Sequence, residues 1–90
     1  EMTVVEKLKD AIGNDMGTYG KIEVKRAIET GAAEEILILS EKAKTEEGIE
    51  LLNLAEQTRT KVIEISPHHH GGEMLTGLGD FAVILRYRLT

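Results

Sequence analysis

The middle of the chain contains the segment Gly31-Ala32-Ala33-Glu34-Glu35-Ile36-Leu37-Ile38-Leu39-Ser40-Glu41, in which four aliphatic residues follow one another without interruption. A strand that is buried on one face alternates apolar and polar residues. An unbroken apolar run of this length is typical of a strand that is covered on both faces. Such a strand needs a layer of helices on each side of its sheet. The segment therefore predicts an α/β fold.

The residues before this strand indicate two helices. Apolar residues with helical spacing define a first helix that begins after Thr3 as its N-cap and ends near Gly13-Asn14. The members of this apolar face are Val4, Val5, Leu8, Ala11 and Ile12. An extended piece over residues 16–19 leads to Gly20, and a second helix with Ile22, Val24, Ala27 and Ile28 closes at Gly31.

The residues after the strand continue the alternation of helices and strands. Thr45 is the expected cap of a third helix, which presents Leu51, Leu52 and Ala55 on one side. Residues 61–66 predict a second buried strand, built on Val62, Ile63 and Ile65 and ended by Pro67. Residues 68–80 hold four of the nine glycines and predict a loop-and-turn unit with a short helix over residues 73–77. Residues 81–89 predict a closing strand.

This order of elements predicts one domain over residues 1–90, a three-layer α/β/α sandwich with a mixed sheet of about four strands. The chain begins at Glu1 and has no apolar stretch of about 18 residues that could span a bilayer. We expect a fragment of a longer, cytoplasmic protein that makes no membrane contact. Residues 41–48 are the expected mobile loop, because their charged side chains have nothing to bury.

The charge and composition of the chain limit which binding and catalytic functions it can have. The 16 acidic and 11 basic residues give a net charge of -5, which disfavours a phosphate-gripping surface as the main function. Local basic patches remain at Lys21, Lys25 and Arg26, and at Arg86 and Arg88. The absence of cysteine excludes thiol nucleophiles and thiolate zinc sites.

No catalytic pattern is found, and the three adjacent histidines leave a metal-binding module only as a rival interpretation. Adjacent histidines, as in 68–70, diverge in most backbones, and no helical His-x-x-x-His spacing accompanies them. Ser40 and Ser66 lack a nucleophile-elbow context, and the neighbouring carboxylates of Glu34 and Glu35 point apart on a strand. The glycine pairs lack the lysine of a phosphate-binding loop. We therefore predict no enzyme activity, no metal and no cofactor.

Two strings of residues are much more specific. The first runs from Tyr19-Gly20 through the second helix into segment 31–41, and the second joins Gly72-Glu73-Met74-Leu75 to Phe81-Ala82-Val83-Ile84-Leu85-Arg86-Tyr87. Together they resemble the C-terminal domain of the Pelota family, ribosome-rescue proteins related to archaeal and eukaryotic class-1 release factors. His69 stands where this family often has a histidine. Asp80 departs from the family's usual glycine, and Gly79 is expected to supply the turn instead.

The resemblance implies a docking module of ribosome rescue and mRNA surveillance (no-go decay). Its implied partners are a translational GTPase of the elongation-factor-1-alpha class, an ABC-type recycling ATPase and, through the full-length protein, the ribosome. The family's nuclease activity is attributed to an N-terminal domain, so this domain is expected to cleave nothing. The expected contact residues lie in two loops: His69, Gly71, Gly72 and Glu73 in one, and Glu41, Lys42 and Lys44 in the other.

Two other families remain as alternatives. Class-1 release factors usually carry an insertion after the first long strand, whereas only residues 41–47 intervene here. The segment 20–31 is also similar to the helix start of kink-turn RNA-binding ribosomal proteins, with Lys21, Lys25 and Arg26 as the RNA-binding candidates. Ile22 occupies the position of a base-contacting Asn in those proteins, which an apolar side chain cannot replace. That match therefore favours a shared fold over shared RNA binding.

Overall fold

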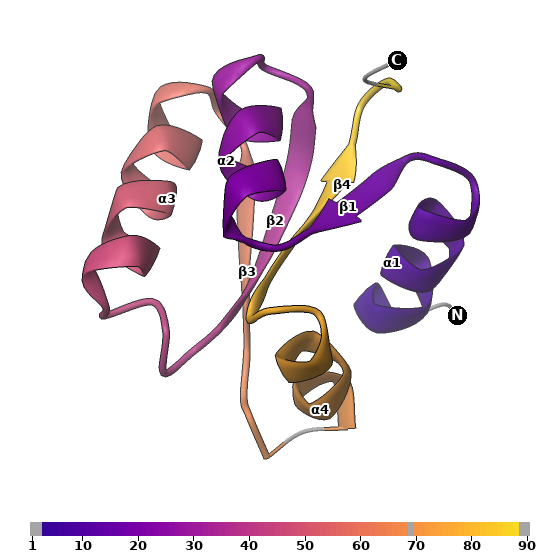
Figure 1. Cartoon of the computed structure of the whole chain (residues 1–90), viewed down its shortest axis with the longest axis vertical. Coiled ribbons are helices and arrows are strands. Elements are labelled where there is room, and N and C mark those ends of the chain that lie inside the picture. Colours follow the sequence, from indigo (N-terminus) through magenta and orange to yellow (C-terminus); the bar gives the residue numbers. More distant parts are fainter. Residues whose placement is uncertain (1–2, 69, 89–90) are drawn as a thin grey trace.

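The computed structural model describes residues 3–68 and 70–88 and shows a three-layer α/β/α sandwich (Figure 1). The elements follow in the order α1 (Val4–Gly13), β1 (Gly17–Tyr19), α2 (Lys21–Glu29), β2 (Ala33–Leu39), α3 (Glu46–Gln57), β3 (Lys61–Ile65), α4 (His70–Gly77) and β4 (Phe81–Leu85). Helices α2 and α3 cover one face of the sheet, and α1 and α4 cover the other. The predicted fold class is confirmed.

The sheet is mixed and has the strand order β1-β4-β2-β3. β2 pairs in parallel with β3 and antiparallel with β4, which also pairs antiparallel with β1. Successive residues of β2 enter opposite cores: Ile36 and Ile38 pack beneath α2 and α3, and Leu37 and Leu39 pack beneath α1 and α4. All four side chains are fully buried, which confirms that this strand is covered on both faces.

Threonine caps position the helices as predicted. The Thr3 hydroxyl accepts a hydrogen bond from the Glu6 amide at the start of α1, and the Thr45 hydroxyl accepts one from the Gly48 amide at the start of α3. Each bond satisfies an amide that has no partner within its own helix. Among the described residues, no helix is long and apolar enough to cross a membrane.

The prediction that β3 is buried was wrong. β3 lies at the edge of the sheet, only Ile65 among its residues is buried, and the side chain of Val62 is 40% exposed. A short aliphatic run does not reveal whether a second neighbouring strand exists. The closing strand is also shorter than predicted and ends at Leu85, and α4 begins at His70 rather than near Glu73.

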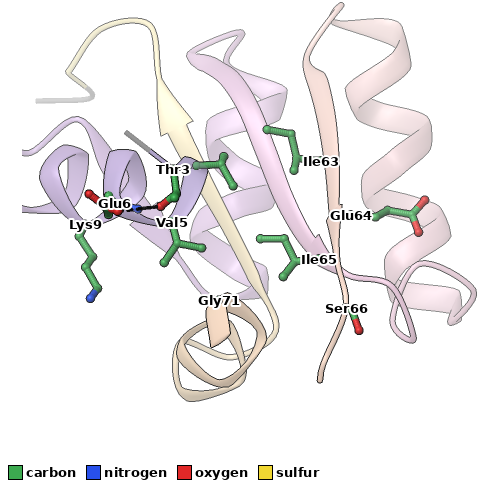
Figure 2. Close-up of a pocket in the computed structure, with 10 residues that line it drawn as sticks. Thr3, Val5, Glu6, Lys9, Ile63, Glu64, Ile65, Ser66 and Gly71 are labelled. Carbon is green, nitrogen blue, oxygen red and sulfur yellow. Dashed lines mark hydrogen bonds between the residues drawn. The ribbon is translucent and has the colours of Figure 1, made fainter. Parts of the chain in front are cut away.

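An open cavity of about 620 Å³ lies where the layer of α1 and α4 covers β3 incompletely (Figure 2). Val4 and Val5 line it from the first turn of α1, Ile63 and Ile65 line it from β3, and Gly71 lines it from α4. The cavity is therefore an apolar groove that begins at the sheet edge.

The turn into β4 uses two residues in the left-handed backbone region. Gly79 has φ of +89°, as expected for the residue that supplies the turn, but Asp80 also has φ of +76°. A residue with a Cβ atom is disfavoured there, although Asp tolerates the region better than most residues. The Asp80 carboxylate additionally lies 3.9 Å from the Lys42 ammonium. The glycine that the Pelota pattern has at this position would remove the backbone cost.

We expect substitutions at Asp80 to rank by their tolerance of positive φ. Asp80→Gly should be at least as stable as Asp80→Asn, and Asp80→Ala should be less stable than Asp80→Gly by about 1 kcal/mol because its Cβ opposes the left-handed conformation. Urea unfolding midpoints at neutral pH measure the order. An alanine variant as stable as the glycine variant would show that the turn imposes no such backbone requirement.

Candidate partner-docking surface

The two loops predicted to contact partners begin at the same edge of the sheet. β2 and β3 are parallel neighbours, so the segments that follow Leu39 and Ile65 leave the sheet side by side. The Ser40 amide donates a hydrogen bond of 2.9 Å to the Ile65 carbonyl and joins the two exits directly. The structure thus brings together segments that lie about 25 residues apart in the sequence, as parallel pairing requires.

The turn from β2 to α3 is closely held. The Thr45 hydroxyl donates to the Lys42 carbonyl at 2.7 Å, and Ala43 packs against the core beneath α2 and α3. Gly48 permits this approach, because a Cβ there would lie 1.8 Å from the Lys42 carbonyl oxygen. The expectation that this segment has nothing to bury was therefore wrong for Ala43.

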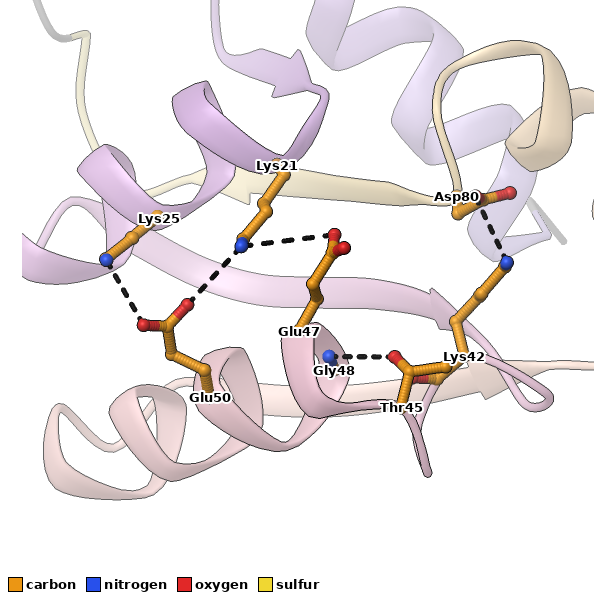
Figure 3. A network of polar contacts seen from close by, with 8 residues as sticks. All are labelled: Lys21, Lys25, Lys42, Thr45, Glu47, Gly48, Glu50 and Asp80. Atoms are coloured by element: carbon orange, nitrogen blue, oxygen red, sulfur yellow. Dashed lines mark hydrogen bonds and ion pairs between the residues drawn. The ribbon is translucent and has the colours of Figure 1, made fainter.

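The charged side chains of this turn differ in what they contact. Those of Glu41 and Lys44 are exposed, whereas Lys42 forms its ion pair with Asp80 of the neighbouring turn (Figure 3). Lys42 therefore connects two of the segments at this edge of the sheet. Glu41 and Lys44 are the two predicted contact residues of this turn that face solvent.

The glycines of the second loop are buried rather than exposed. Gly71 and Gly72 lie in the first turn of α4, and a Cβ on Gly72 would come within 2.2 Å of the Ser66 carbonyl oxygen. Gly72 thus allows α4 to pack against the chain that leaves β3. Glu73 is exposed, and His69 lies outside the described residues. The accessible candidates at this edge are therefore Glu41, Lys44 and Glu73, with Lys42 partly accessible.

The adjacent carboxylates of β2 point to opposite faces, as predicted. Glu34 is exposed, whereas Glu35 is 7% exposed and lies 3.3 Å from the Lys7 ammonium of α1. The ion pair with Lys7 was not visible in the sequence, because it joins residues from different elements. Within residues 3–68 and 70–88, no group of three or more His, Asp or Glu side chains could hold a metal ion.

The basic candidates on α2 are paired with acidic residues of α3. The Lys25 ammonium lies 3.2 Å from the Glu50 carboxylate, and the Lys21 ammonium lies 3.7 Å from Glu50 and 4.0 Å from Glu47 (Figure 3). The hydrogen bond from Lys25 is the main reason why the pKa of Glu50 is lowered, and the charges of Lys25 and Lys21 act in the same direction. These contacts neutralise charge that RNA binding would require.

The other basic candidates, Arg26 and Arg86, are placed differently from Lys21 and Lys25. Arg26 is exposed on α2. The Arg86 guanidinium donates from Nε to the Ala33 carbonyl at 3.0 Å, and from Nη2 to the Thr58 and Arg59 carbonyls at 3.4 Å each. It therefore joins the end of β4 to the start of β2 and the end of α3. This role in holding the fold was missed at the sequence level, where Arg86 was a candidate for a basic patch.

We expect removal of Lys25 to raise the pKa of Glu50 toward its ordinary value of 4.5. Because the folded-state pKa is lowered, the pairing stabilises the fold above pH 4.5 and is lost as the pH falls through the folded-state value. NMR titration of the Glu50 side-chain carbonyl in Lys25→Met measures the change, with Lys21→Met as the matched control that shifts it less. Equal shifts in both variants would contradict the dominance of Lys25.

Comparison with known families agrees with this fold. The family model described as eRF1 domain 3 matches residues 1–89. The pelota homologue of Pyrococcus horikoshii is 41% identical over 93 residues, which covers 99% of this chain and 26% of that protein. The pelota homologue of Methanobrevibacter smithii is 35% identical over 91 residues, with the same coverage. The chain thus spans about a quarter of the length of these relatives.

Solved structures show the same relationship. The Pelota protein of Thermoplasma acidophilum has a TM-score of 0.89 and 32% identity, over 96% of this chain and 28% of that chain. The archaeal translation termination factor aRF1 has a TM-score of 0.74 and 32% identity, over 90% of this chain and 23% of that chain. The resemblance to Pelota proteins is confirmed, and the chain belongs to the eRF1 domain 3 family.

Proposed function

We propose that this chain is the C-terminal, partner-docking domain of a Pelota-like factor for ribosome rescue and mRNA surveillance. The observation that supports this function most strongly is the match to pelota homologues over 99% of the chain at up to 41% identity. The pelota homologues are about four times as long as the chain, which fits one domain of a larger cytoplasmic protein. The domain would bind partners and would leave RNA cleavage to other parts of such a protein.

The partners follow from the structural relatives. One, 36% identical with a TM-score of 0.84 over 97% of this chain and 26% of that chain, is a model of ribosome-bound archaeal Pelota and ABCE1. Another, 29% identical with a TM-score of 0.85 over 96% of this chain and 26% of that chain, is Saccharomyces cerevisiae Dom34, described as interacting with Hbs1. By analogy, we infer that this domain contacts an ABC-type recycling ATPase and a translational GTPase of the elongation-factor-1-alpha class. The ribosome would be reached through the full-length protein.

A release-factor role is the second candidate, because aRF1 shares 32% identity and the same fold. The turn between β2 and α3 favours the Pelota role. Only residues 40–45 connect Leu39 to Glu46, and the resemblance associates release factors with an insertion at this place. Both roles place partner contacts on a rigid sandwich, so they differ in partner and in cellular process rather than in the type of surface.

The contact surface that we propose lies at the carboxyl ends of β2 and β3. Its exposed charges come from two turns that are fixed by Gly48, Gly72 and the ion pair of Lys42 with Asp80. A pre-organised surface loses little conformational entropy on binding. Opposite charges at Lys44 and Glu73 would orient a partner, and their reversal would place like charges across the interface.

We expect the charge reversals Lys44→Glu and Glu73→Lys to weaken binding of the 90-residue chain to a purified archaeal GTPase of this class or to the ABC ATPase. The effect should be about fivefold or more in Kd, because reversed charges repel the partner. Calorimetry with ribonuclease-treated proteins measures it. Glu56→Lys, near the far end of α3, is the matched control and should leave Kd unchanged.

The possible results test the proposed contact surface and the proposed docking function independently of each other. Tight binding that neither reversal alters would move the contact surface elsewhere on the domain. Failure of the unmodified chain to bind either protein would contradict the docking function itself. A charge-reversal effect shared equally by Glu56→Lys would indicate a general effect of net charge rather than a defined surface.

A further inference from the structure

The outer edge of β3 is a second surface with the features of a binding site. Within residues 3–68 and 70–88, the strand order places no strand beyond β3. The Ile65 carbonyl accepts from the Ser40 amide, so Ile65 directs its main-chain groups toward β2. Main-chain direction alternates along a strand, and Val62 and Glu64 therefore direct their N–H and C=O groups outward. These groups can pair with another extended chain.

The groove beside this edge offers room for side chains of such an added strand. On the α1 side, Ile63 and Ile65 face Val5 across the cavity of about 620 Å³ (Figure 2), and Val4 also lines this cavity. An added strand directs every second side chain to this face of the sheet. Aliphatic side chains at those positions would cover apolar surface that α1 leaves open. The groove thus favours an occupant with apolar residues at alternate positions.

The opposite face of β3 favours basic side chains in an added strand. Figure 2 shows the Glu64 side chain pointing away from α1, and this side chain is exposed. A residue of an added strand that lies beside Glu64 would be favoured if it were Lys or Arg. Glu6 and Lys9 at the α1 rim carry opposite charges and impose no net preference. The chain's net charge of -5 also favours a basic occupant.

We propose that β3 binds an extended segment of a partner protein in which aliphatic residues alternate with basic ones. The segment would extend the sheet beyond β3, with main-chain hydrogen bonds to Val62 and Glu64 and aliphatic side chains in the groove. Main-chain pairing would supply affinity, and the alternating pockets would supply selectivity. The groove borders the turn that follows β3, because Ser66 and Gly71 also line it. The proposed main-chain pairing with Val62 and Glu64 does not depend on the proposed GTPase or ATPase partners.

The test uses an end-capped heptapeptide of alternating valine and lysine as the probe. NMR of the isotope-labelled chain at physiological salt should show shifts over residues 61–65 and slower hydrogen exchange of the Val62 and Glu64 amides. A peptide of the same composition in scrambled order should bind more weakly by about tenfold. An alternating valine and glutamate peptide should also bind more weakly, because Glu64 would repel it.

Two variants at one position isolate the main-chain contribution. Glu64→Pro removes the outward N–H. Proline is tolerated at such a position of an edge strand, because the hydrogen bonds to β2 come from the neighbouring residues. It should lower the affinity for the probe about tenfold or more, whereas Glu64→Ala keeps the N–H and should lower it only a few-fold. Unfolding midpoints and the spectra of residues outside β3 show whether each variant remains folded. If the proline variant unfolds, amide protection in the unmodified chain decides the question.

Several results would overturn the proposal. Equal affinity for the scrambled peptide would indicate attraction by net charge alone. Shifts at Val5 and Ile63 without protection of the Val62 and Glu64 amides would indicate a helical occupant of the groove. Protection of these amides that grows with the concentration of the chain alone would indicate a second copy of this chain as the occupant. Undiminished binding by a folded Glu64→Pro variant would exclude strand addition.

Discussion

The burial of β2 on both faces is the constraint on which the architecture depends. Ile36 and Ile38 belong to one core and Leu37 and Leu39 to the other, so one short strand supplies two separate hydrophobic clusters. Each such side chain contributes about 1.5–3 kcal/mol when it leaves water. Neither cluster could form without its own layer of helices. The positions of α2 and α3 on one face, and of α1 and α4 on the other, follow from this requirement.

The surfaces available for binding follow from the same arrangement. Because β2 and β3 are parallel, the chain leaves both strands at one edge, and the connecting turns form a surface between them and the starts of α3 and α4. Close backbone approaches at Gly48 and Gly72 hold these turns against the strands. The exposed side chains of these turns include the charged residues Glu41, Lys44 and Glu73, which suits the proposed recognition of a partner on a pre-shaped surface.

Charge pairing limits what the acidic domain can bind. Lys21 and Lys25 contact carboxylates of α3. Arg86, which follows β4, donates to main-chain carbonyls at the start of β2 and after α3. These cations stabilise contacts between elements, so they contribute less to any field that would attract nucleic acid. The structure therefore favours the proposed protein-docking role over RNA binding by this member of the eRF1 domain 3 family.

Local signals in the sequence determined the elements and the fold class. Threonine caps, helical spacing of apolar residues and the aliphatic run of β2 act within a few residues, and each was confirmed. The two motif strings also indicated the Pelota resemblance, because they preserve residue types at fixed spacing.

Only the tertiary structure decided which aliphatic strand lies inside the sheet and which polar groups pair. β3 contains three aliphatic residues, a pattern that predicted a buried strand, yet the strand order leaves it at the edge. The pairs Lys7–Glu35, Lys25–Glu50 and Lys42–Asp80 join residues 25 to 38 positions apart. Such contacts depend on how whole helices and strands pack against one another. The local sequence pattern does not determine that packing.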